Sequence, residues 1–233
     1  MINDVSFIIP VYNEEKRIFN IRNWIKWFRK NTNNCELVLS LNGCNDGTEK
    51  IVKSLKYKNL KYYVSKNKGR GYAIKKALNN SKKKYSSICS IDNAWNKNFY
   101  IKAFKEISKK KKLFCVYGPK DHKYSKQKRI LIRKIISFIS IIFLRLFFFG
   151  KINQDTQCIK LFVNKKKFIK KLKNYNYFFD THFFLLNKEL KLKYFNIPVM
   201  VNDNNKHSKV KINSMIEFIF EAIDYSINKI KIF

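Results

Sequence analysis

The sequence predicts an α/β protein whose mostly parallel central sheet has helices on both faces. In the first half, short apolar runs typical of buried strands alternate with segments whose apolar residues have helical spacing. Polar and glycine-rich turns follow several of these strands, and the ends of strands are where such sheets bind ligands. The chain has 233 residues, which suits one domain of this kind.

The predicted elements begin with a buried strand at Val5–Ile9, which Pro10 stops, and a helix from about Glu14 to Lys30. Further strands are expected at 36–41, 60–64, 85–91 and 113–117, and further helices from 48 and from 72 to about 78. In a parallel sheet the polar turns after the strands share one edge. Those turns are 13–14, 42–48, 67–71 and Asp92.

The second half begins with a basic stretch, residues 120–134, and the strongly apolar stretch Ile135–Phe149. As a helix the apolar stretch would be roughly 22 Å long, too short to cross a hydrocarbon core of ~30 Å. Two interpretations stay open: a helix in a membrane interface with its flanking cations at the headgroups, or a completely buried core helix. A C-terminal helix is expected from Ser214.

Composition limits the function less than the motifs do. The net charge of +34 indicates attraction to anions, or it reflects a lysine-rich coding bias. Specific nucleic-acid binding is disfavoured because we find no helix-turn-helix pattern, zinc spacing or basic region interleaved with stacking aromatics. The five cysteines form no Cys-x-x-Cys pair, so we expect a reduced, cytoplasmic setting.

Seven short motifs occur in a recognisable order. The first three are residues 7–15 (FIIPVYNEE), 42–48 (NGCNDGT) and 67–73 (NKGRGYA). They resemble family-2 inverting glycosyltransferases of the GT-A fold. The others are 155–158 (DTQC) with 160–162, 179–180, 197–199 and 208–210. These resemble the polyprenyl-phosphate branch, which includes dolichyl-phosphate glucosyl- and mannosyltransferases, and the resemblance covers about residues 5–220.

The resemblance implies one GT-A domain over residues 1–233. Its nucleotide-sugar-binding half would be about 1–119, and its acceptor- and membrane-facing half about 120–233. The implied reaction transfers a hexose from UDP-glucose or GDP-mannose to a polyprenyl phosphate with inversion. Two alternatives stay open: a polysaccharide acceptor, and a degenerate GT-A domain that binds nucleotide or a partner without turnover.

A leaving nucleoside diphosphate needs its charge neutralised, and Mg²⁺ or Mn²⁺ held by oxygen ligands suits this role. The family places an Asp-x-Asp motif after the fourth strand. An ungapped match puts Ser90-Ile91-Asp92 there, which makes Asp92 the metal ligand; the other register, Asp92-Asn93-Ala94, also retains one carboxylate. The resemblance makes Gln157 a further contributor to the metal site.

The resemblance also assigns the remaining site residues. Arg70, Asp92 and Asp180 are expected to be catalytic. Substrate-binding residues are expected at Pro10, Tyr12, Glu14, Asn42, Asp46, Lys68, Gly69, Gly71, Thr156, Lys160, Ser208 and Lys209. The glycines let backbone approach phosphate, and Arg70 offers it a fork of donors. Asp46 has a second interpretation, in which it orders its own loop.

The expectation for the acceptor depends on one difference from the branch. The branch usually has Glu two residues after the Asp that aligns with Asp180. Here His182 takes that place. A hydroxyl acceptor needs a general base, whereas a phosphate is already ionised near neutral pH. The difference therefore favours a phosphate acceptor. The branch has its membrane-docking segment before Asp155, so the resemblance favours the interface helix. We expect peripheral attachment to an anionic, cytosol-facing leaflet.

Overall fold

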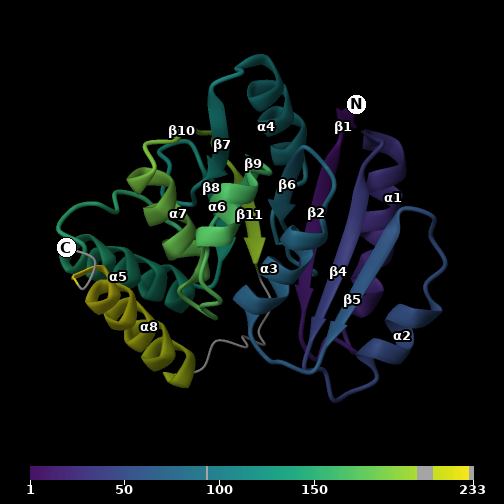
Figure 1. Cartoon of the computed structure of the whole chain (residues 1–233), viewed down its shortest axis with the longest axis horizontal. Coiled ribbons are helices and arrows are strands. Elements are labelled where there is room, and N and C mark those ends of the chain that lie inside the picture. The colour runs from purple at the N-terminus through teal and green to yellow at the C-terminus, as the bar shows by residue number, and fades with distance from the viewer. Residues whose placement is uncertain (93, 204–211, 231–233) are drawn as a thin grey trace.

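The computed structural model describes residues 1–92, 94–203 and 212–230, and its centre is a seven-stranded sheet in the order β10-β7-β9-β6-β2-β4-β5 (Figure 1). The strands are β2 (Val5–Val11), β4 (Glu36–Asn42), β5 (Leu60–Ser65), β6 (Tyr85–Ile88), β7 (Leu113–Gly118), β9 (Ile159–Val163) and β10 (Lys193–Asn196). Neighbouring strands are parallel, except that β9 runs antiparallel to both β6 and β7. The expected mostly parallel sheet is confirmed.

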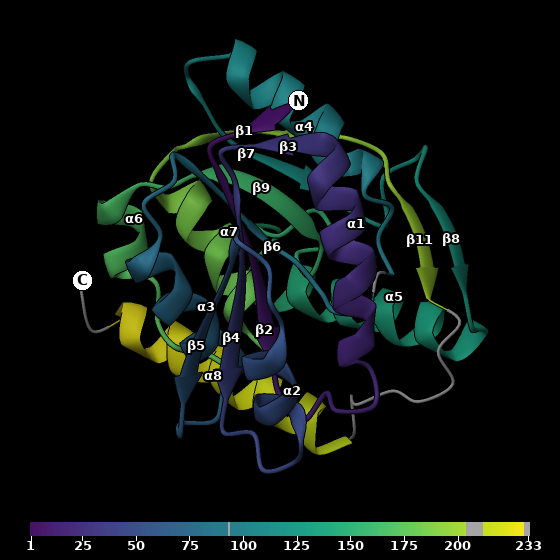
Figure 2. The same ribbon diagram turned by 90° about the vertical axis from the view of Figure 1, so that its right-hand side faces the viewer.

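Helices cover both faces of this sheet (Figure 2). They are α1 (Ile21–Asn31), α2 (Thr48–Ser54), α3 (Arg70–Asn80), α4 (Asn98–Lys109), α5 (Leu131–Phe147), α6 (Lys166–Lys171), α7 (Phe179–Glu189) and α8 (Ile212–Ile230), with a 3₁₀ turn at Ile18–Asn20. Alternate residues of β2 serve the two faces: Phe7 joins the core beneath α1 and α4, and Ile8 joins the core beneath α3 and α7.

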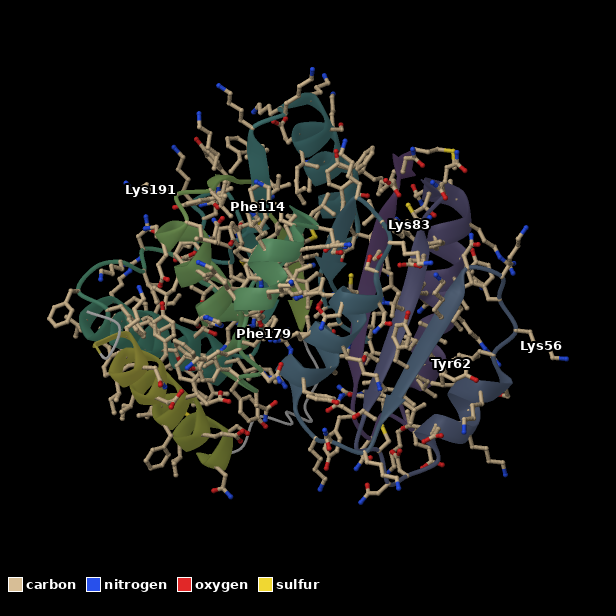
Figure 3. The ribbon with its side chains drawn as sticks, viewed as in Figure 1. Lys56, Tyr62, Lys83, Phe114, Phe179 and Lys191 are labelled. Atoms are coloured by element: carbon tan, nitrogen blue, oxygen red, sulfur yellow. The ribbon has the colours of Figure 1, made fainter. Side chains whose placement is uncertain are left out.

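Most charged side chains lie on the outside of these layers, and Lys160 and Asp180 are among the buried exceptions. Figure 3 shows Lys56 and Lys191 pointing away from the body, while Phe114 and Phe179 lie in its interior. The positive charge is therefore carried at the surface, where it is solvated and able to attract anions.

Two small parallel ladders complete the fold. One joins β1 (Ile2–Asn3) to β3 (Thr32–Asn33), and the other joins β8 (Lys126–Arg129) to β11 (Met200–Asp203). Trp95, which follows β6, makes an isolated bridge to Val201 of β11. The second ladder thus places the start of α5 beside the loop that carries Asp92.

The expectation that Pro10 stops the first strand is wrong, because β2 continues to Val11 and pairs with β4 there. The carbonyl of Ile8 accepts the N–H of Cys89, so Ile8 faces β6, and Pro10, two residues on, faces the same side. Pairing with β6 ends at Ile8. The N–H that proline lacks is therefore not needed by any ladder.

Other boundaries also differ from the expected ones. The first helical turn begins at Ile18 rather than Glu14, because Asn13 has a left-handed φ of 49° and the following residues bond to a neighbouring loop. Strand β6 ends at Ile88 rather than Ile91, and α3 begins at Arg70 rather than Tyr72.

The exposure of helix α5 tests the buried-core interpretation of the apolar stretch. It begins at Leu131, and of its 17 residues Leu144 is the one that is buried. Its exposed large apolar residues are Leu131, Ile132, Ile135, Ile136, Phe138, Ile139, Ile142 and Leu146. Complete burial in the core is therefore wrong.

Candidate active site

The loops after β2 and β4 are joined side by side. The backbone N–H of Glu14 donates to Thr48 Oγ1 at 2.8 Å, and the N–H of Gly47 donates to Glu15 Oε2 at 3.1 Å. Asp46 accepts N–H groups from Thr48 and Glu15 at 3.0 and 3.3 Å. The interpretation in which Asp46 orders its own loop is thus supported by its contacts.

Asn42, the last residue of β4, connects the second motif to the glycine turn. Its amide donates to the carbonyl of Val11 at 2.8 Å, and its Oδ1 accepts the N–H of Gly69 at 3.2 Å. Gly69 has a φ of 128°, a conformation that residues with a Cβ rarely adopt. Beside it, the Lys68 ammonium lies 5.9 Å from the centre of the Tyr12 ring, which is exposed.

Arg70, Asp180 and Lys160 form a charge cluster between α3, α7 and β9. Arg70 Nη1 lies 2.5 Å from Asp180 Oδ2, and Lys160 Nζ lies 2.5 Å from Asp180 Oδ1. Burial raises the pKa of Asp180, but the two cations outweigh it and hold that pKa below its usual value. The side chain of Arg70 is 36% exposed and that of Lys160 is 1% exposed, so Arg70 is the cation that a ligand can reach.

The segment before α7 holds Arg70 from a second direction. Asn176 Oδ1 accepts the backbone N–H of Arg70 at 2.8 Å. A Cβ at Gly71 would collide with the carbonyl oxygen of Tyr175, so the glycine lets α3 approach this segment. Residues 175–178, which we name the α7 entry loop, therefore fix the position of the glycine turn.

Asp92 and Gln157 are the expected metal contributors. Asp92 is half-buried after β6, and its Oδ1 accepts the N–H of Ala94 at 3.2 Å. Gln157 is exposed, and its side chain reaches the carbonyl of Tyr177 at 3.5 Å. Among the residues that the structure describes, no three His, Cys, Asp or Glu side chains gather where they could hold a metal ion. One carboxylate and one amide suit a metal whose other ligands are phosphate oxygens and water.

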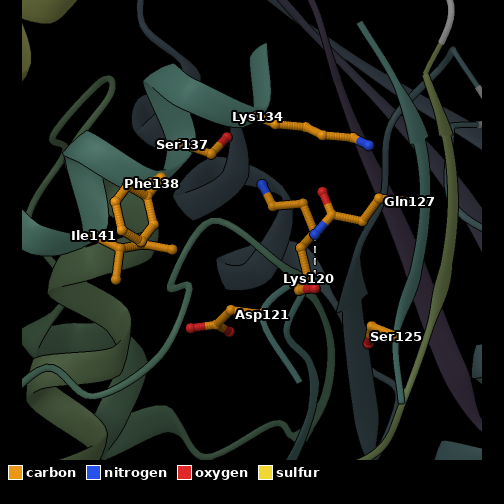
Figure 4. Close-up of a pocket in the computed structure, with 8 residues that line it drawn as sticks. All are labelled: Lys120, Asp121, Ser125, Gln127, Lys134, Ser137, Phe138 and Ile141. Carbon is orange, nitrogen blue, oxygen red and sulfur yellow. Dashed lines mark hydrogen bonds between the residues drawn. The ribbon is translucent and has the colours of Figure 1, made fainter. Parts of the chain in front are cut away.

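A cavity of about 390 Å³ opens between the β7–β8 loop and α5 (Figure 4). Its lining residues are Lys120, Asp121, Ser125, Gln127, Lys134, Ser137, Phe138 and Ile141. The Gln127 amide donates to the carbonyl of Lys120 at 2.9 Å. Two ammonium groups and apolar side chains of α5 thus share one pocket, which we name the α5 pocket.

The α5 pocket lies next to the two segments that carry the expected metal contributors, Asp92 and Gln157. Lys120 Nζ lies 3.2 Å from Asp155 Oδ2 and 5.7 Å from the centre of the Trp95 ring. Asp155 Oδ1 accepts the N–H of Gln157 at 3.1 Å. Trp95 is three residues after Asp92. Lys120 therefore lies at the border between the pocket and the Asp92 loop.

His182 is packed into the interior. Its ring centre lies 5.3 Å from those of both Tyr175 and Tyr225, and burial is the main cause that lowers its pKa from 6.5 to about 4. Its Nδ1 accepts the N–H of Lys173 at 3.4 Å. A ring enclosed in this way is unsuited to take a proton from a substrate.

A sequence model of glycosyl transferase family 2 matches residues 6–195. The chain belongs to glycosyl transferase family 2. The order of motifs and the sheet that positions them agree with this membership, and the protein is a glycosyltransferase.

Solved structures similar to this glycosyltransferase include glucosyl-3-phosphoglycerate synthase from Mycobacterium tuberculosis. Its complex with Mn²⁺, uridine diphosphate and glucosyl-3-phosphoglycerate has a TM-score of 0.67 at 13% identity, over 94% of this chain and 78% of that chain. Its complex with Mn²⁺, UDP-glucose and phosphoglyceric acid has a TM-score of 0.66 at 12% identity, over the same shares. These likenesses establish the GT-A fold. No curated protein matches the chain.

The glycosyltransferase brings many of the expected site residues together at the carboxyl edge of its sheet. Pro10 is the penultimate residue of β2, and Glu14 binds Arg17 through both carboxylate oxygens, at 2.7 and 2.8 Å. Thr156 and Lys160 are buried, and Thr156 bonds to Thr181 of α7 at 2.8 Å. Ser208 and Lys209 lie outside the described residues. The roles assigned to all these residues stay predictions.

Several residues of the site were not expected. They are Lys120, Lys134 and Ser137 of the α5 pocket, Asn176 of the α7 entry loop and Glu221 of α8. The basic stretch before the apolar segment was a signal for the first group. Nothing in the sequence marked Asn176 or Glu221, because their role depends on which distant segments meet. As for membrane spans, no helix in the described part of the chain is long and apolar enough to cross a bilayer.

Proposed function

We propose that this glycosyltransferase transfers one hexose from UDP-glucose or GDP-mannose to a polyprenyl phosphate, with inversion, at a membrane surface. The observation that carries the proposal is the α5 pocket, where Lys120 and Lys134 lie beside the exposed apolar side chain of Phe138. A lipid phosphate has the two matching parts, an anionic head and an apolar chain. Few other acceptors combine them.

The donor is proposed to bind across the ends of β2, β4 and β6. Arg70 is the exposed cation of the charge cluster, and Asp180 and Asn176 hold it in place. Lys68 and the open turn at Gly69 lie next to it. These groups would bind the diphosphate and stabilise the charge that develops on it when the sugar leaves.

Asp92 and Gln157 are the residues that would hold a divalent cation with the donor. Mg²⁺ or Mn²⁺ bound there would neutralise charge on the diphosphate. The similar structures named above contain Mn²⁺ with uridine diphosphate or UDP-glucose, which supports the same class of donor complex here.

The contacts of α7 support a phosphate as the acceptor. Both oxygens of Asp180 are engaged by cations, and His182 is enclosed by tyrosines. Neither is placed to deprotonate a hydroxyl. A phosphate monoester is ionised near neutral pH and attacks without a base, so transfer to it does not require either side chain to accept a proton.

Helix α5 is proposed to lie in the membrane interface. Its exposed residues include Ile132, Phe138 and Leu146, at 57, 65 and 73%. Basic residues flank them at Arg133, Lys134 and Arg145. Apolar side chains with cations at the headgroup level bind anionic membrane surfaces, so the pocket would open toward the lipid.

A second candidate acceptor is a small phosphorylated acid in solution. The similar synthase structures contain phosphoglyceric acid or glucosyl-3-phosphoglycerate, and the cations of the α5 pocket would also attract such a phosphate. That reaction forms a bond to a hydroxyl and would need a base, whereas the exposed apolar face of α5 would have no role in it.

The test supplies labelled UDP-glucose or GDP-mannose with Mn²⁺ or Mg²⁺ to the protein in two arms. One arm contains vesicles with a polyprenyl phosphate, and the other contains 3-phosphoglycerate. We expect label in the lipid extract, as a β-linked product of an α-linked donor. Label in the aqueous phosphoglycerate alone would replace the lipid with the second candidate. No product in either arm would favour a domain without turnover.

Lys120→Ala and Lys134→Ala test the pocket within the same assay. Both should lower transfer to the lipid. Lys134→Ala should leave nucleotide binding unchanged, whereas Lys120→Ala also leaves Asp155, which holds Gln157, without its cation. Lys112→Ala, an exposed lysine before β7, is the matched control for a lost surface charge. Equal lipid labelling by wild type and both pocket variants would show that the acceptor binds elsewhere.

A further inference from the structure

Helix α8 has an unusual distribution of side chains. Its exposed large apolar residues are Met215, Ile216, Ile219, Phe220, Ile223 and Ile227, and Glu217 and Asp224 are exposed beside them. The side of the helix that carries Ala222 and Tyr225 packs in the core. A helix at the surface of a protein in water normally presents polar residues outward. The exposed face of α8 therefore indicates contact with an apolar phase.

All three carboxylates of α8 bond to one segment of the protein. Glu221 accepts the N–H groups of Asn176, Tyr177 and Phe178 at 2.5, 3.0 and 2.9 Å. Glu217 accepts from the Asn176 side chain at 3.0 Å, and Asp224 accepts from the Tyr175 hydroxyl at 2.7 Å. The negative charge of α8 is thus directed at the α7 entry loop.

The α7 entry loop leads directly to the donor side of the site. The three N–H groups held by Glu221 belong to Phe178, the N-cap residue of α7, and to the two residues before it, so the carboxylate lies where an α-helix favours negative charge. Asp180 is in the first turn of α7 and binds Arg70. Asn176 accepts the backbone N–H of Arg70. Two short chains of contacts therefore connect α8 to Arg70.

Helices α5 and α8 are neighbours in the fold. Phe148, directly after α5, has its ring centre 6.0 Å from that of Tyr225 on α8, and both helices lie at the lower left of Figure 1. The net charge of +34 favours an anionic occupant over a second copy of the same basic chain, which would be repelled. An anionic bilayer supplies both the charge and the apolar phase.

We propose that α8 is a second membrane-docking helix. When α8 binds an anionic bilayer, it holds the α7 entry loop in place, and the loop in turn positions Arg70 and Asp180 to bind the nucleotide. The proposal rests on the proposed function for the membrane location. Coupling of this kind is reciprocal, so the donor also strengthens attachment to the bilayer.

The first measurement needs no ligand. Hydrogen exchange of the amides of Asn176, Tyr177 and Phe178 is compared with and without vesicles containing anionic phospholipid and no polyprenyl phosphate. We expect slower exchange with vesicles. Neutral vesicles should have a weaker effect. Equal exchange in all three conditions would overturn the coupling, whatever acceptor the enzyme uses, so failure here is distinct from failure of the proposed function.

The second measurement is the affinity for UDP and for GDP, each with Mn²⁺. Anionic vesicles should raise the affinity of the preferred nucleotide by about fivefold or more, the usual lower range for coupled sites. Glu221→Ala should still float with vesicles but lose both the exchange protection and the gain in affinity. If Glu221→Ala retains both, the contacts through Glu221 do not carry the coupling.

The outward face is tested with Ile216→Ser together with Phe220→Ser. This variant should behave as wild type in exchange without vesicles, and should lose the response to them. Ile101→Ser, an exposed apolar residue of α4, is the matched control and should respond fully. A wild-type response from the α8 variant would show that α8 does not dock. A wild-type dimer in sedimentation that this variant abolishes would replace the bilayer with a second copy.

Discussion

Arg70 Nη1 and Asp180 Oδ2 lie 2.5 Å apart and join the start of α3 to the first turn of α7 across 110 residues of sequence. The same carboxylate binds Lys160, which is buried. Asp180 therefore balances one exposed and one buried cation. This arrangement predicts that the two cations respond differently to mutation.

Asp180→Ala should be strongly destabilising, because it leaves Lys160 in the interior without a counter-charge. Removing one partner of a buried pair costs about 3–5 kcal/mol, and urea denaturation would measure it. Combining Asp180→Ala with Lys160→Met should recover part of that loss. Arg70→Ala should cost about 1 kcal/mol or less, because Arg70 is partly exposed, yet it should weaken nucleotide binding. Similar stability for Asp180→Ala and Arg70→Ala would contradict this account.

Asp92→Ala should abolish sugar transfer and metal-dependent nucleotide binding while the fold stays intact. Asp92 is half-buried and its described contact is the N–H of Ala94, so little of the fold depends on it. Calorimetric titration of nucleotide with and without Mn²⁺ would measure the loss. Glu106→Ala on α4 is the control for removing a carboxylate, and turnover by Asp92→Ala at the wild-type rate would move the metal site elsewhere.

Ser90→Asp tests the register of the Asp-x-Asp motif. If Ser90-Ile91-Asp92 is the correct alignment, a second carboxylate at this position should tighten Mn²⁺ binding in the presence of nucleotide. The backbone carbonyl of Ser90 accepts from the indole of Trp24 at 3.1 Å, a bond that the substitution retains. Unchanged metal affinity would favour the register that starts at Asp92.

The sequence predicted the sheet well because buried parallel strands are short apolar runs, and β4 and β7 are within one residue of their expected bounds. The polar turns at the carboxyl ends of these strands were predicted for the same reason, because each follows such an apolar run. Contacts between distant segments were not predictable: Glu221 meets the α7 entry loop, and Lys120 meets Asp155, through the packing of the whole second half. The placement of Pro10 inside β2 depended on where β6 ends, which local sequence does not encode.

Gly71→Ala should destabilise the protein and weaken nucleotide binding together. The new Cβ would collide with the backbone carbonyl of Tyr175, which cannot move without displacing the α7 entry loop. Overpacking of this kind typically costs about 1–3 kcal/mol. Gly47→Ala is the matched control, since its Cβ would meet the flexible end of Glu15. Equal effects of the two substitutions in thermal unfolding would show that the close approach at Gly71 is unimportant.

The enclosed His182 predicts a loss of stability in acid. Its pKa is about 4 in the folded protein, whereas the ordinary value of 6.5 applies to the unfolded chain, so the unfolded chain binds its proton first as the pH falls. The stabilisation is complete above about pH 6.5 and is lost as the pH falls through about 4, by about 3 kcal/mol in all. His182→Gln should flatten this part of the profile in urea titrations. The lowered pKa of Asp180 acts in the same direction below its ordinary value of 3.8, so the two windows can be separated.

The exposed face of α5 predicts which residues attach the protein to a membrane. Ile132, Phe138, Ile139 and Leu146 are each more than half exposed, whereas Phe143 and Phe147 are partly buried against the core. Replacing the first four by Ser should leave urea stability near wild type, because their contacts are with solvent. Burying a large apolar side chain contributes about 1.5–3 kcal/mol, and half of that over four residues lowers vesicle partitioning roughly a hundredfold or more.

Flotation with anionic vesicles would measure this partitioning, and the pair of inward residues provides the internal comparison. Phe143→Ser with Phe147→Ser should reduce stability through lost packing with the core. Ile101→Ser with Phe195→Ser removes exposed apolar side chains elsewhere and should float as wild type. If the four-residue variant floats undiminished while remaining folded, attachment does not occur through α5. If it unfolds instead, these four side chains pack against the protein, and α5 does not present them to the membrane.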